Sequence, residues 1–439
     1  MADAPETLRV QPGGRLSGEL RVPGDKSISH RAVMLSAIAD GVSRITGVLA
    51  GADVLATMAA FRALGVTIEG PEDGNVTVHG VGREGLRAPK APLDLQNSGT
   101  AMRLIAGLLA GQTFGATLVG DVSLSRRPMG RIVEPLRRMG ASIETTPAGT
   151  APLVISPAAG LAGIEYALPV ASAQVKSALL LAGLWARGRT CVIEPAPTRD
   201  HTERMLRGFH YGCERHGDRI CVEGGGRLAA CDIDVPADLS STAFFLVGAS
   251  IAPASDLRLR HVGINPTRTG ILDILTRMGA DIRQENAREV GGEPVADLRV
   301  RAASLRGIEV PPALVPLAID EFPILCIAAA CARGVTRITG AEELRHKESD
   351  RIAVMAAGLS RLGVPVRETP DGMAIEGGGG FAGGEIDSRG DHRIAMAFSI
   401  AALAARGEIV VRDCRNVATS FPGFHELAAR AGLAISGET

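Results

Sequence analysis

One structural motif recurs six times along this chain of 439 residues, and the recurrence limits the folds that are possible. In each copy a turn with Gly or Ser leads into a short β-branched strand. A loop carrying charge or proline follows, and then an amphipathic helix ends in an apolar residue, a glycine and a small residue. Glycine at a helix end fits a left-handed C-cap, after which the next strand begins. The copies are 40–66, a copy ending at 141, a weaker one at 188–212, one ending at 280, 333–364 and 406–432; 40–66 and 333–364 share the tetrapeptide Arg-Ile-Thr-Gly.

Alternation of strand and helix predicts parallel crossovers covered by helices, and hence an α/β fold. The composition agrees, because 46% of residues are apolar, only 3% are aromatic and 54 are glycine. Six units are too many for one core, so we predict two domains of three units. The Pro-containing crossings 22–24 and 235–237 are the natural linkers. They give one domain at 23–235 and a discontinuous one at 1–22 and 236–439.

Charge and cysteine content exclude several function classes. A net charge of −1 and few aromatics argue against nucleic-acid binding but leave anionic small molecules as substrates. Residues 1–20 contain no apolar signal core, and no apolar run reaches the roughly 18 residues that span a membrane. The seven cysteines form no CxxC pair, so we expect reduced, mostly buried thiols, with neither a disulfide framework nor a zinc site. A cytoplasmic monomer without metal is expected.

The segment 23–31, PGDKSISHR, carries the strongest chemical signal. Its Pro-Gly turn delivers Lys26 and Ser27 to the start of an apolar helical run over 31–39. Free backbone N–H groups and the helix dipole favour anions at that point. Five positions separate Lys26 from Arg31, so both can reach one ligand with several acidic groups. The alternative is Ser27 as a plain N-cap between two solvated cations.

Similar polar clusters precede other helices of the repeats. Each alone is equally compatible with a helix cap, a solvated face or a charged helix. Their shared position favours a function, because repeats that face each other would focus many cations on one cleft. The clusters are NSGTAMR (97–103), SRRPMGR (125–131), SAQVKS (172–177), TRDH (198–201), DEFP (320–323), EELRHKESDR (342–351) and DHR (391–393).

Taken together, these segments resemble the 5-enolpyruvylshikimate-3-phosphate synthase family, the 3-phosphoshikimate 1-carboxyvinyltransferases. The resemblance covers almost the whole chain and rests on PGDKSISHR, NSGTAMRL, RRPMGR, SAQVKSA, NPTRTG, DEFP, RHKESDR and DHRIAM. It implies two domains of three βαβαββ units each, an inside-out α/β barrel, with the active site in the cleft between them. It also implies transfer of the enolpyruvyl group of phosphoenolpyruvate to the 5-hydroxyl of shikimate 3-phosphate, in aromatic amino-acid biosynthesis, without a cofactor.

The resemblance also assigns roles to individual residues. Asp320, Glu348 and Lys26 would be catalytic. The residues that would bind shikimate 3-phosphate are Lys26, Ser27, Arg31, Ser172, Ala173, Gln174, Arg199, Asp320 and Lys347. The residues that would bind phosphoenolpyruvate are Lys26, Gly99, Arg127, Gln174, Arg351 and Arg393.

The chain departs from the family pattern at three positions. Many members read Lys-Thr-Phe-Pro where this chain has Thr419-Ser420-Phe421-Pro422, so a lysine on the phosphoenolpyruvate side is missing. Arg199 stands where many members have an aromatic residue, and Glu343 where many have Asn. Several motifs are closer to the divergent bacterial class. Gly99 stands where tolerant members carry alanine, which predicts sensitivity to the inhibitor glyphosate.

The reaction needs a base at the hydroxyl, an acid at the methylene carbon C3, and cations for a carboxylate and two phosphates. Asp320 is the expected base, while Glu348 and Lys26 both remain candidates for proton transfer at C3. One alternative is UDP-N-acetylglucosamine enolpyruvyl transferase, whose family places Asn after the first lysine and a reactive Cys in the loop equivalent to 121–131. Here Ser27 follows Lys26 and that loop has no Cys. A second alternative is a non-catalytic α/β solenoid-like binding protein.

Overall fold

The computed structural model describes residues 4–439, and its chain divides into two compact units. The inserted unit comprises Gly24–Val235 together with Val290–Glu293. The terminal unit comprises the residues up to Pro23, Pro236–Glu289 and Pro294–Thr439. The chain therefore passes between the units at Pro23–Gly24 and at Val235–Pro236, and a short excursion at 290–293 belongs with the inserted unit.

The inserted unit contains three four-stranded sheets of the same topology. In each sheet two strands pair in parallel, and an antiparallel hairpin extends the pair. The first sheet consists of β16 (Ile233–Asp234), β3 (Asp40–Thr46), β5 (Asn75–Val81) and β4 (Thr67–Glu72). The second consists of β6 (Leu93–Asp94), β7 (Ala116–Val119), β9 (Leu153–Ile155) and β8 (Ile143–Glu144). The third consists of β11 (Glu165–Ala167), β13 (Arg189–Ile193), β15 (Arg219–Glu223) and β14 (Cys213–His216), beside the short pair β10 (Leu161–Ala162) and β12 (Ala186–Arg187).

Two kinds of helix connect these strands. One helix of each repeat is buried along nearly its whole length: α1 (Lys26–Ala37), α3 (Gly99–Leu109) and α5 (Ala173–Gly183). The other helix is amphipathic and half-buried: α2 (Ala52–Ala63), α4 (Gly130–Arg138) and α6 (His201–Gly208). Helices α3 and α5 pack closely, because a Cβ at Gly107 would lie 2.2 Å from the carbonyl oxygen of Ala178. Only glycine permits this approach.

The terminal unit repeats the pattern with three sheets. They are β23 (Gly384–Asp387), β24 (Ile409–Arg412), β1 (Thr7–Val10) and β25 (Ile435–Glu438); β18 (Asp281–Val290), β19 (Glu293–Arg301), β17 (Asp256–Gly263) and β2 (Ser17–Leu20); and β20 (Gly334–Ile338), β22 (Gly372–Gly377) and β21 (Val366–Thr369). Its buried helices are α7 (Leu239–Ile251), α9 (Phe322–Cys331) and α11 (His392–Ala401). Its amphipathic helices are α8 (Gly270–Met278), α10 (Arg351–Arg361) and α12 (Phe424–Ala431). Its 3₁₀ turns are η2 (Pro312–Leu314), η3 (Glu342–His346), η4 (Ala402–Ala404) and η5 (Arg415–Thr419), whereas η1 (Leu124–Arg126) lies in the inserted unit.

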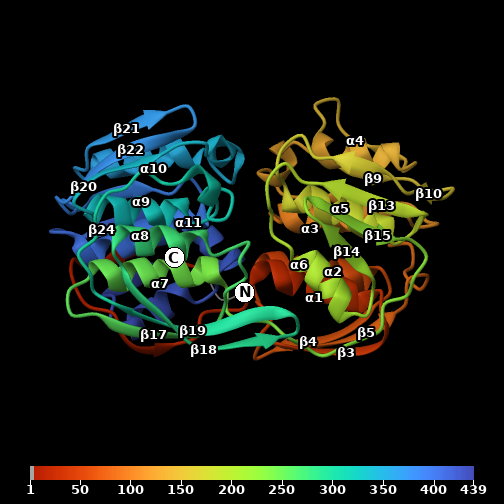
Figure 1. Ribbon diagram of the computed structural model, residues 1–439, viewed down its shortest axis with the longest axis horizontal. Helices are drawn as coiled ribbons and strands as arrows, with labels where there is room; N and C mark the ends of the chain where they lie inside the picture. Colours follow the sequence, from red (N-terminus) through yellow and green to blue (C-terminus); the bar gives the residue numbers. More distant parts are fainter. Residues whose placement is uncertain (1–3) are drawn as a thin grey trace. The chain divides into compact units, whose positions relative to one another are not determined.

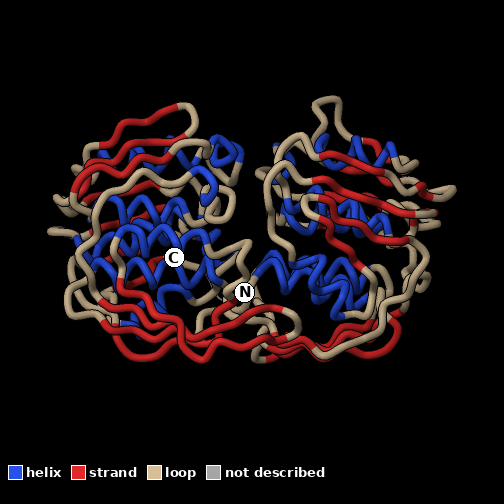
Figure 2. The backbone as a smooth tube through the Cα atoms, in the orientation of Figure 1, coloured by secondary structure: helices blue, strands red, loops and turns tan. Residues whose placement is uncertain are grey.

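The α/β class and the six βαβαββ repeats are confirmed. In each unit the buried helices lie inside and the strands cover them, as Figures 1 and 2 show. Each unit has its own apolar core built on these helices. None of the helices among residues 4–439 has the length and apolar content needed to cross a membrane.

The glycine that ends each predicted repeat helix is confirmed for five repeats and wrong for one. Five of these glycines have a left-handed backbone, with φ between 82° and 115°: Gly65, Gly140, Gly279, Gly363 and Gly432. After α6 the left-handed residue is instead His210, with a φ of 59°. The helix that follows the PGD turn also begins earlier than predicted, at Lys26 rather than Arg31, because Asp25 caps it by accepting from the amide of Ile28.

The expectation that all cysteines are reduced is wrong in this structure, because Cys191 and Cys221 form a disulfide. The two residues face each other in the antiparallel register of β13 and β15, and each is nearly fully buried. A pair 30 residues apart becomes visible only when the strand register is known. Five cysteines stay free; among them burial raises the pKa of Cys326, Cys331 and Cys414 to about 12, so these thiols are poor nucleophiles at neutral pH.

We expect the protein purified without reductant and then denatured to show five titratable thiols, and seven after reduction. Closing a loop of 30 residues restricts the unfolded chain, so replacing Cys191 and Cys221 together by alanine should lower the free energy of unfolding by about 3–4 kcal/mol. Thiol titration and chemical denaturation measure the two effects. Replacing the free Cys231, which is half-buried, serves as the control. Seven thiols before reduction would show that the pair is open.

Candidate active site

The buried helices of the inserted unit present their polar residues at their N-termini. Each is capped by a side chain one residue before the helix: Asp25 for α1, Ser98 for α3 and Ser172 for α5. The helix residues that are not buried are Lys26, Ser27, Thr100, Ala173 and Gln174, all within the first two positions. Four of these five were predicted to bind substrate. These N-termini offer free N–H groups and a positive dipole end to an anion.

Gln174 joins the N-termini of α5 and α3. Its Oε1 accepts from Arg103 Nη1 at 2.6 Å, and its Nε2 donates to the hydroxyl of Thr100 at 3.1 Å. A Cβ at Gly99 would lie 2.9 Å from Arg103 Nη1 and 3.2 Å from Arg127 Nη1. Gly99, Arg127 and Gln174, which were predicted to bind phosphoenolpyruvate, therefore lie around one point. Arg103, which belongs to the NSGTAMR motif, was not predicted as a site residue.

Arg31 is buried and held by three hydrogen bonds. It donates from Nε to the hydroxyl of Thr202 at 2.7 Å, from Nη2 to that of Ser177 at 2.8 Å, and from Nη1 to the carbonyl of Ser27 at 2.9 Å. Burial lowers the pKa of Arg31 to about 10, although Glu203 opposes this and Arg199 adds to it. The structure thus brings together Arg31 and Ser27, two residues predicted to bind shikimate 3-phosphate. Arg199 lies in the loop before α6, the helix that carries Thr202.

Lys26 forms an ion pair with Asp53 at the start of α2, a partner that sequence reasoning missed. The lysine side chain is 21% exposed, whereas that of Asp53 is 6% exposed. Lys26 therefore keeps an open side on which a ligand can replace or share the carboxylate. Ser27, predicted as the alternative helix cap, does not fill that role, which Asp25 takes.

The terminal unit gathers a second set of predicted residues around Arg351. Asp320 Oδ1 lies 3.5 Å from both Lys347 Nζ and Arg351 Nη1. Glu348 Oε2 lies 2.7 Å from Arg351 Nη2. The two predicted acid–base residues, Asp320 and Glu348, thus share one arginine.

Asp391 is the fully buried partner that fixes Arg351. Its carboxylate accepts from Arg351 Nε at 2.8 Å and Nη2 at 3.3 Å, and from the hydroxyl of Ser349 at 3.1 Å. Burial alone would lower the pKa of Arg351 and raise that of Asp391, but their attraction outweighs burial, so the pKa of Arg351 is raised and that of Asp391 lowered. Arg351 Nη1 is left without a hydrogen bond among the described residues. This buried donor is available to a ligand.

A further polar group, none of whose members was predicted as a site residue, lies beside Arg393. Arg393 Nη1 lies 4.0 Å from Glu321 Oε1, and Glu321 also accepts from the hydroxyl of Ser240. Arg268 of the NPTRTG motif donates to the same hydroxyl at 2.6 Å and to Asp238 at 3.0 Å. The sequence signals were the motifs DEFP and NPTRTG, which contain Glu321 and Arg268, and the position of Asp238, which caps α7 as Asp391 caps α11.

Thr419, the position of the missing lysine, ends the 3₁₀ turn η5 and donates its hydroxyl to the carbonyl of Asn416 at 2.7 Å. It therefore serves the local turn here. Ser420 is buried, and Phe421 belongs to the apolar core. Among residues 4–439, no group of three or more His, Cys, Asp and Glu has the arrangement needed to hold a metal ion.

Comparison with known proteins identifies the family to which these motifs correspond. Residues 10–427 match the model of EPSP synthase (3-phosphoshikimate 1-carboxyvinyltransferase). The chain is 67% identical to the 3-phosphoshikimate 1-carboxyvinyltransferase of Alkalilimnicola ehrlichii, over 98% of this chain and 96% of that one. It is 65% identical to that of Methylococcus capsulatus, over 99% of both chains.

Solved structures agree with this result. The EPSP synthase of Acinetobacter baumannii is 55% identical, with a TM-score of 0.90 over 99% of this chain and 100% of that chain. The enolpyruvyl transferase NikO of Streptomyces tendae is 20% identical, with a TM-score of 0.81 over 98% and 99% of the two chains. The second likeness concerns the fold alone.

The buried ion pair of the terminal unit predicts how stability depends on pH. Replacing Asp391 by Asn keeps a helix cap but leaves Arg351 buried beside fewer negative charges, so the free energy of unfolding at neutral pH should fall by about 3–5 kcal/mol. Because the folded pKa of Asp391 is lowered, its stabilisation is complete above the pKa of the unfolded chain, near 4, and is lost as the pH falls through the folded value. Denaturation curves from pH 7 downward should therefore converge for wild type and Asp391→Asn. Asp387→Asn, which removes an exposed partner of Arg389, is the control and should change stability by less than about 1 kcal/mol. An equal loss in both variants would contradict the argument.

Proposed function

Since the chain belongs to the EPSP synthase family, we propose that the two groups of charged residues described above serve one reaction. The chain is a 3-phosphoshikimate 1-carboxyvinyltransferase by family, an enzyme of the shikimate pathway. The reaction transfers the enolpyruvyl group of phosphoenolpyruvate to the 5-hydroxyl of shikimate 3-phosphate and releases phosphate. Both substrates are small anions, which suits clusters of Arg and Lys at helix N-termini.

We assign the residues of the inserted unit to binding. Ser27, Arg31, Ser172, Ala173, Gln174 and Arg199 are proposed to bind shikimate 3-phosphate, with Lys26 contacting both substrates. Gly99, Arg127 and Gln174 are proposed to bind phosphoenolpyruvate. Two observations support this division: Gly99, Arg127 and Gln174 lie close together, and Arg31 donates to the carbonyl of Ser27.

We assign the chemistry to the terminal unit, together with Lys26. Asp320 takes the proton of the 5-hydroxyl as the oxygen attacks C2 of phosphoenolpyruvate, and Lys347 holds the shikimate side. Either Glu348 or Lys26 delivers the proton to C3. When phosphate then leaves from the tetrahedral intermediate, the same group takes a proton back from C3, which restores the C2–C3 double bond in the product. Arg351 and Arg393 stabilise the charge of phosphoenolpyruvate. The observation that carries this assignment is Asp320, held 3.5 Å from two cations beside Glu348, with Arg351 Nη1 left without a hydrogen bond within the described part of the chain.

Cellular location, oligomeric state, partners and domain bounds are proposed from the sequence. We propose a cytoplasmic monomer that binds no nucleic acid, because a net charge of −1 produces no general basic field. The domains are proposed to be 1–22 with 236–439, and 23–235, with both contributing to the active site.

The direct test is phosphate release from phosphoenolpyruvate with each of two acceptors. Shikimate 3-phosphate should support turnover, and UDP-N-acetylglucosamine should not. Turnover with the nucleotide sugar instead would select the alternative transferase, and binding without turnover would select a binding protein.

Replacing Asp320 by Asn should lower kcat by about 10²–10⁴-fold while changing the KM of shikimate 3-phosphate far less, because the amide keeps the shape but cannot accept the proton. Steady-state kinetics with both substrates measure this split. Asp387→Asn, an exposed carboxylate of the same unit, is the control with unchanged kinetics. If binding weakens in proportion to the rate, Asp320 is a ligand and not the base.

Replacing Gly99 by Ala tests the phosphoenolpyruvate side. The new Cβ would press on the ends of Arg103 and Arg127, which must shift. The wild type should be inhibited by glyphosate in competition with phosphoenolpyruvate. The substitution should raise the inhibition constant of glyphosate about tenfold or more, because one methyl group in a fitted site discriminates by that much. It should raise the KM of phosphoenolpyruvate by less. Gly212→Ala is the matched control, because a Cβ there meets nothing within 4 Å. Equal rises in both constants would disprove selective crowding of the inhibitor.

A further inference from the structure

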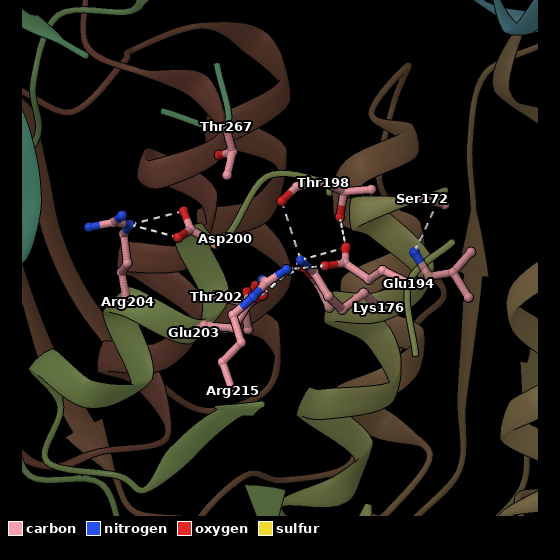
Figure 3. Close-up of polar contacts among 12 residues, drawn as sticks. Ser172, Lys176, Glu194, Thr198, Asp200, Thr202, Glu203, Arg204, Arg215 and Thr267 are labelled. Carbon is pink, nitrogen blue, oxygen red and sulfur yellow. Dashed lines mark hydrogen bonds and ion pairs between the residues drawn. The ribbon is translucent and has the colours of Figure 1, made fainter. Parts of the chain in front are cut away.

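Lys176 is fully buried in the inserted unit, between two carboxylates that are also buried. Its Nζ lies 2.9 Å from Glu194 Oε1 and 2.7 Å from Glu203 Oε1. The three side chains are 0%, 1% and 3% exposed, and Figure 3 shows the lysine reaching the two acids from α5. Lysine is almost never buried this completely unless it is paired, because the ammonium loses its hydration.

Two further residues complete what we call the Lys176 cluster: Lys176, Glu194, Thr198, Glu203 and Arg215. Arg215 Nη2 lies 3.1 Å from Glu194 Oε2, and Nη1 lies 3.9 Å from Glu203 Oε1. The hydroxyl of Thr198 donates to Glu194, and Lys176 donates to the carbonyl of Thr198 at 3.5 Å. The cluster holds two cations and two anions, so its charge is balanced.

The cluster connects the segments that we assign to shikimate 3-phosphate. Lys176 is two residues from Gln174 and adjacent to Ser177, which binds Arg31. Glu203 is adjacent to Thr202, the other partner of Arg31. Thr198 precedes Arg199 in the loop between β13 and α6. Three separate elements therefore meet on one buried ammonium group, while none of its own surface is open to a ligand.

Packing alone does not require this arrangement. Apolar side chains of similar volume would fill the same space without any desolvation cost, and such replacements in other proteins are neutral or stabilising. Charged groups add directional contacts, which fix the positions of the elements that carry them. The loop 195–200 is not anchored by apolar packing at its centre, because residues 195 and 197 are exposed. Its buried residue, Thr198, is held by hydrogen bonds to Glu194 and Lys176.

We propose that Lys176 is a positioning residue for shikimate 3-phosphate: it holds the Thr198–Arg199 loop and Arg31 against the N-terminus of α5 without touching the substrate. The inference rests on the proposed assignment of Arg31, Gln174 and Arg199. On this proposal, the first half of the SAQVKSA motif binds the ligand, and the lysine of the motif holds the binding residues in position. Phosphoenolpyruvate shares Lys26 and Gln174 with shikimate 3-phosphate, but its other assigned ligands, Gly99, Arg127 and residues of the terminal unit, lie outside the Lys176 cluster. Its binding should therefore depend less on Lys176.

The test replaces Lys176 by Met in the full chain. We expect the KM and the calorimetric Kd of shikimate 3-phosphate to rise about tenfold or more, as for misplaced ligand groups. The KM of phosphoenolpyruvate should change less than about threefold, which corresponds to well under one decade of affinity. Leu181→Ala, on the same helix and 1% exposed, is the control for a general loss of stability and should leave the affinity unchanged.

Charge balance provides the rescue. Met at 176 leaves one cation against two carboxylates, and adding Glu203→Gln restores one against one. The double variant should bind shikimate 3-phosphate more tightly than Lys176→Met. A double variant that binds no better, or a folded single variant with unchanged affinity, would overturn the proposal. So would a Leu181→Ala control that loses the same affinity at equal stability.

If Lys176→Met does not fold, Thr198→Val replaces it. Valine keeps the shape of threonine and removes only the hydroxyl bond to Glu194. A rise of about threefold or more in the Kd of shikimate 3-phosphate is expected from the loss of one buried hydrogen bond, and no rise would overturn the proposal. Wild-type turnover is measured first and independently. Its absence would refute the proposed function, whereas a failed variant comparison refutes only the role of Lys176.

Discussion

The near-complete burial of the central helices is the constraint on which the rest of the structure depends. A helix packed on all sides has no solvent-facing side, so polar residues that are to remain accessible can stand only at its ends. At the N-terminus they also meet free N–H groups and the positive end of the dipole. In α1, α3 and α5 the residues that are not buried are all among the first two helical positions, and in α11 the single one is Arg393, also at the second position. The residues that we propose to bind anions therefore gather where the repeat leaves them room.

The same packing places some charged side chains in the interior, and in both units these buried charges are paired. In the inserted unit Lys176 lies between two glutamates, and in the terminal unit Arg351 lies among Asp391, Glu348 and Asp320. Removing one member of such a group leaves an uncompensated buried charge, which costs more than the pair contributes. Exposure separates the lysines proposed to bind substrate from the lysine proposed to support them: Lys26 and Lys347 are 21% and 23% exposed, while Lys176 is 0% exposed.

The parts predictable from the sequence were those that depend on local signals. The repeats follow from periodicity and from glycines with positive φ, and the motif residues lie at helix starts because caps and turns precede them. His210 was missed because a left-handed residue other than glycine leaves no signal. The pairings of Lys26 with Asp53, of Arg351 with Asp391 and of Cys191 with Cys221 were missed for another reason. Each joins elements far apart in the chain, and only the packing or register brings them together.

Arg351 shows how the support and the chemistry meet in one side chain. Its Nε and Nη2 are used by Asp391 and Glu348, which fix the plane of the guanidinium. Its Nη1 lies 3.5 Å from Asp320 and makes no hydrogen bond to the described residues. A buried donor without a hydrogen bond costs free energy in the free protein, and the ion pair with Asp320 offsets only part of that cost. The proposed binding of phosphoenolpyruvate would supply the missing hydrogen bond. This contact would hold phosphoenolpyruvate near Asp320, the proposed base for the 5-hydroxyl, through a donor that the fold has already oriented.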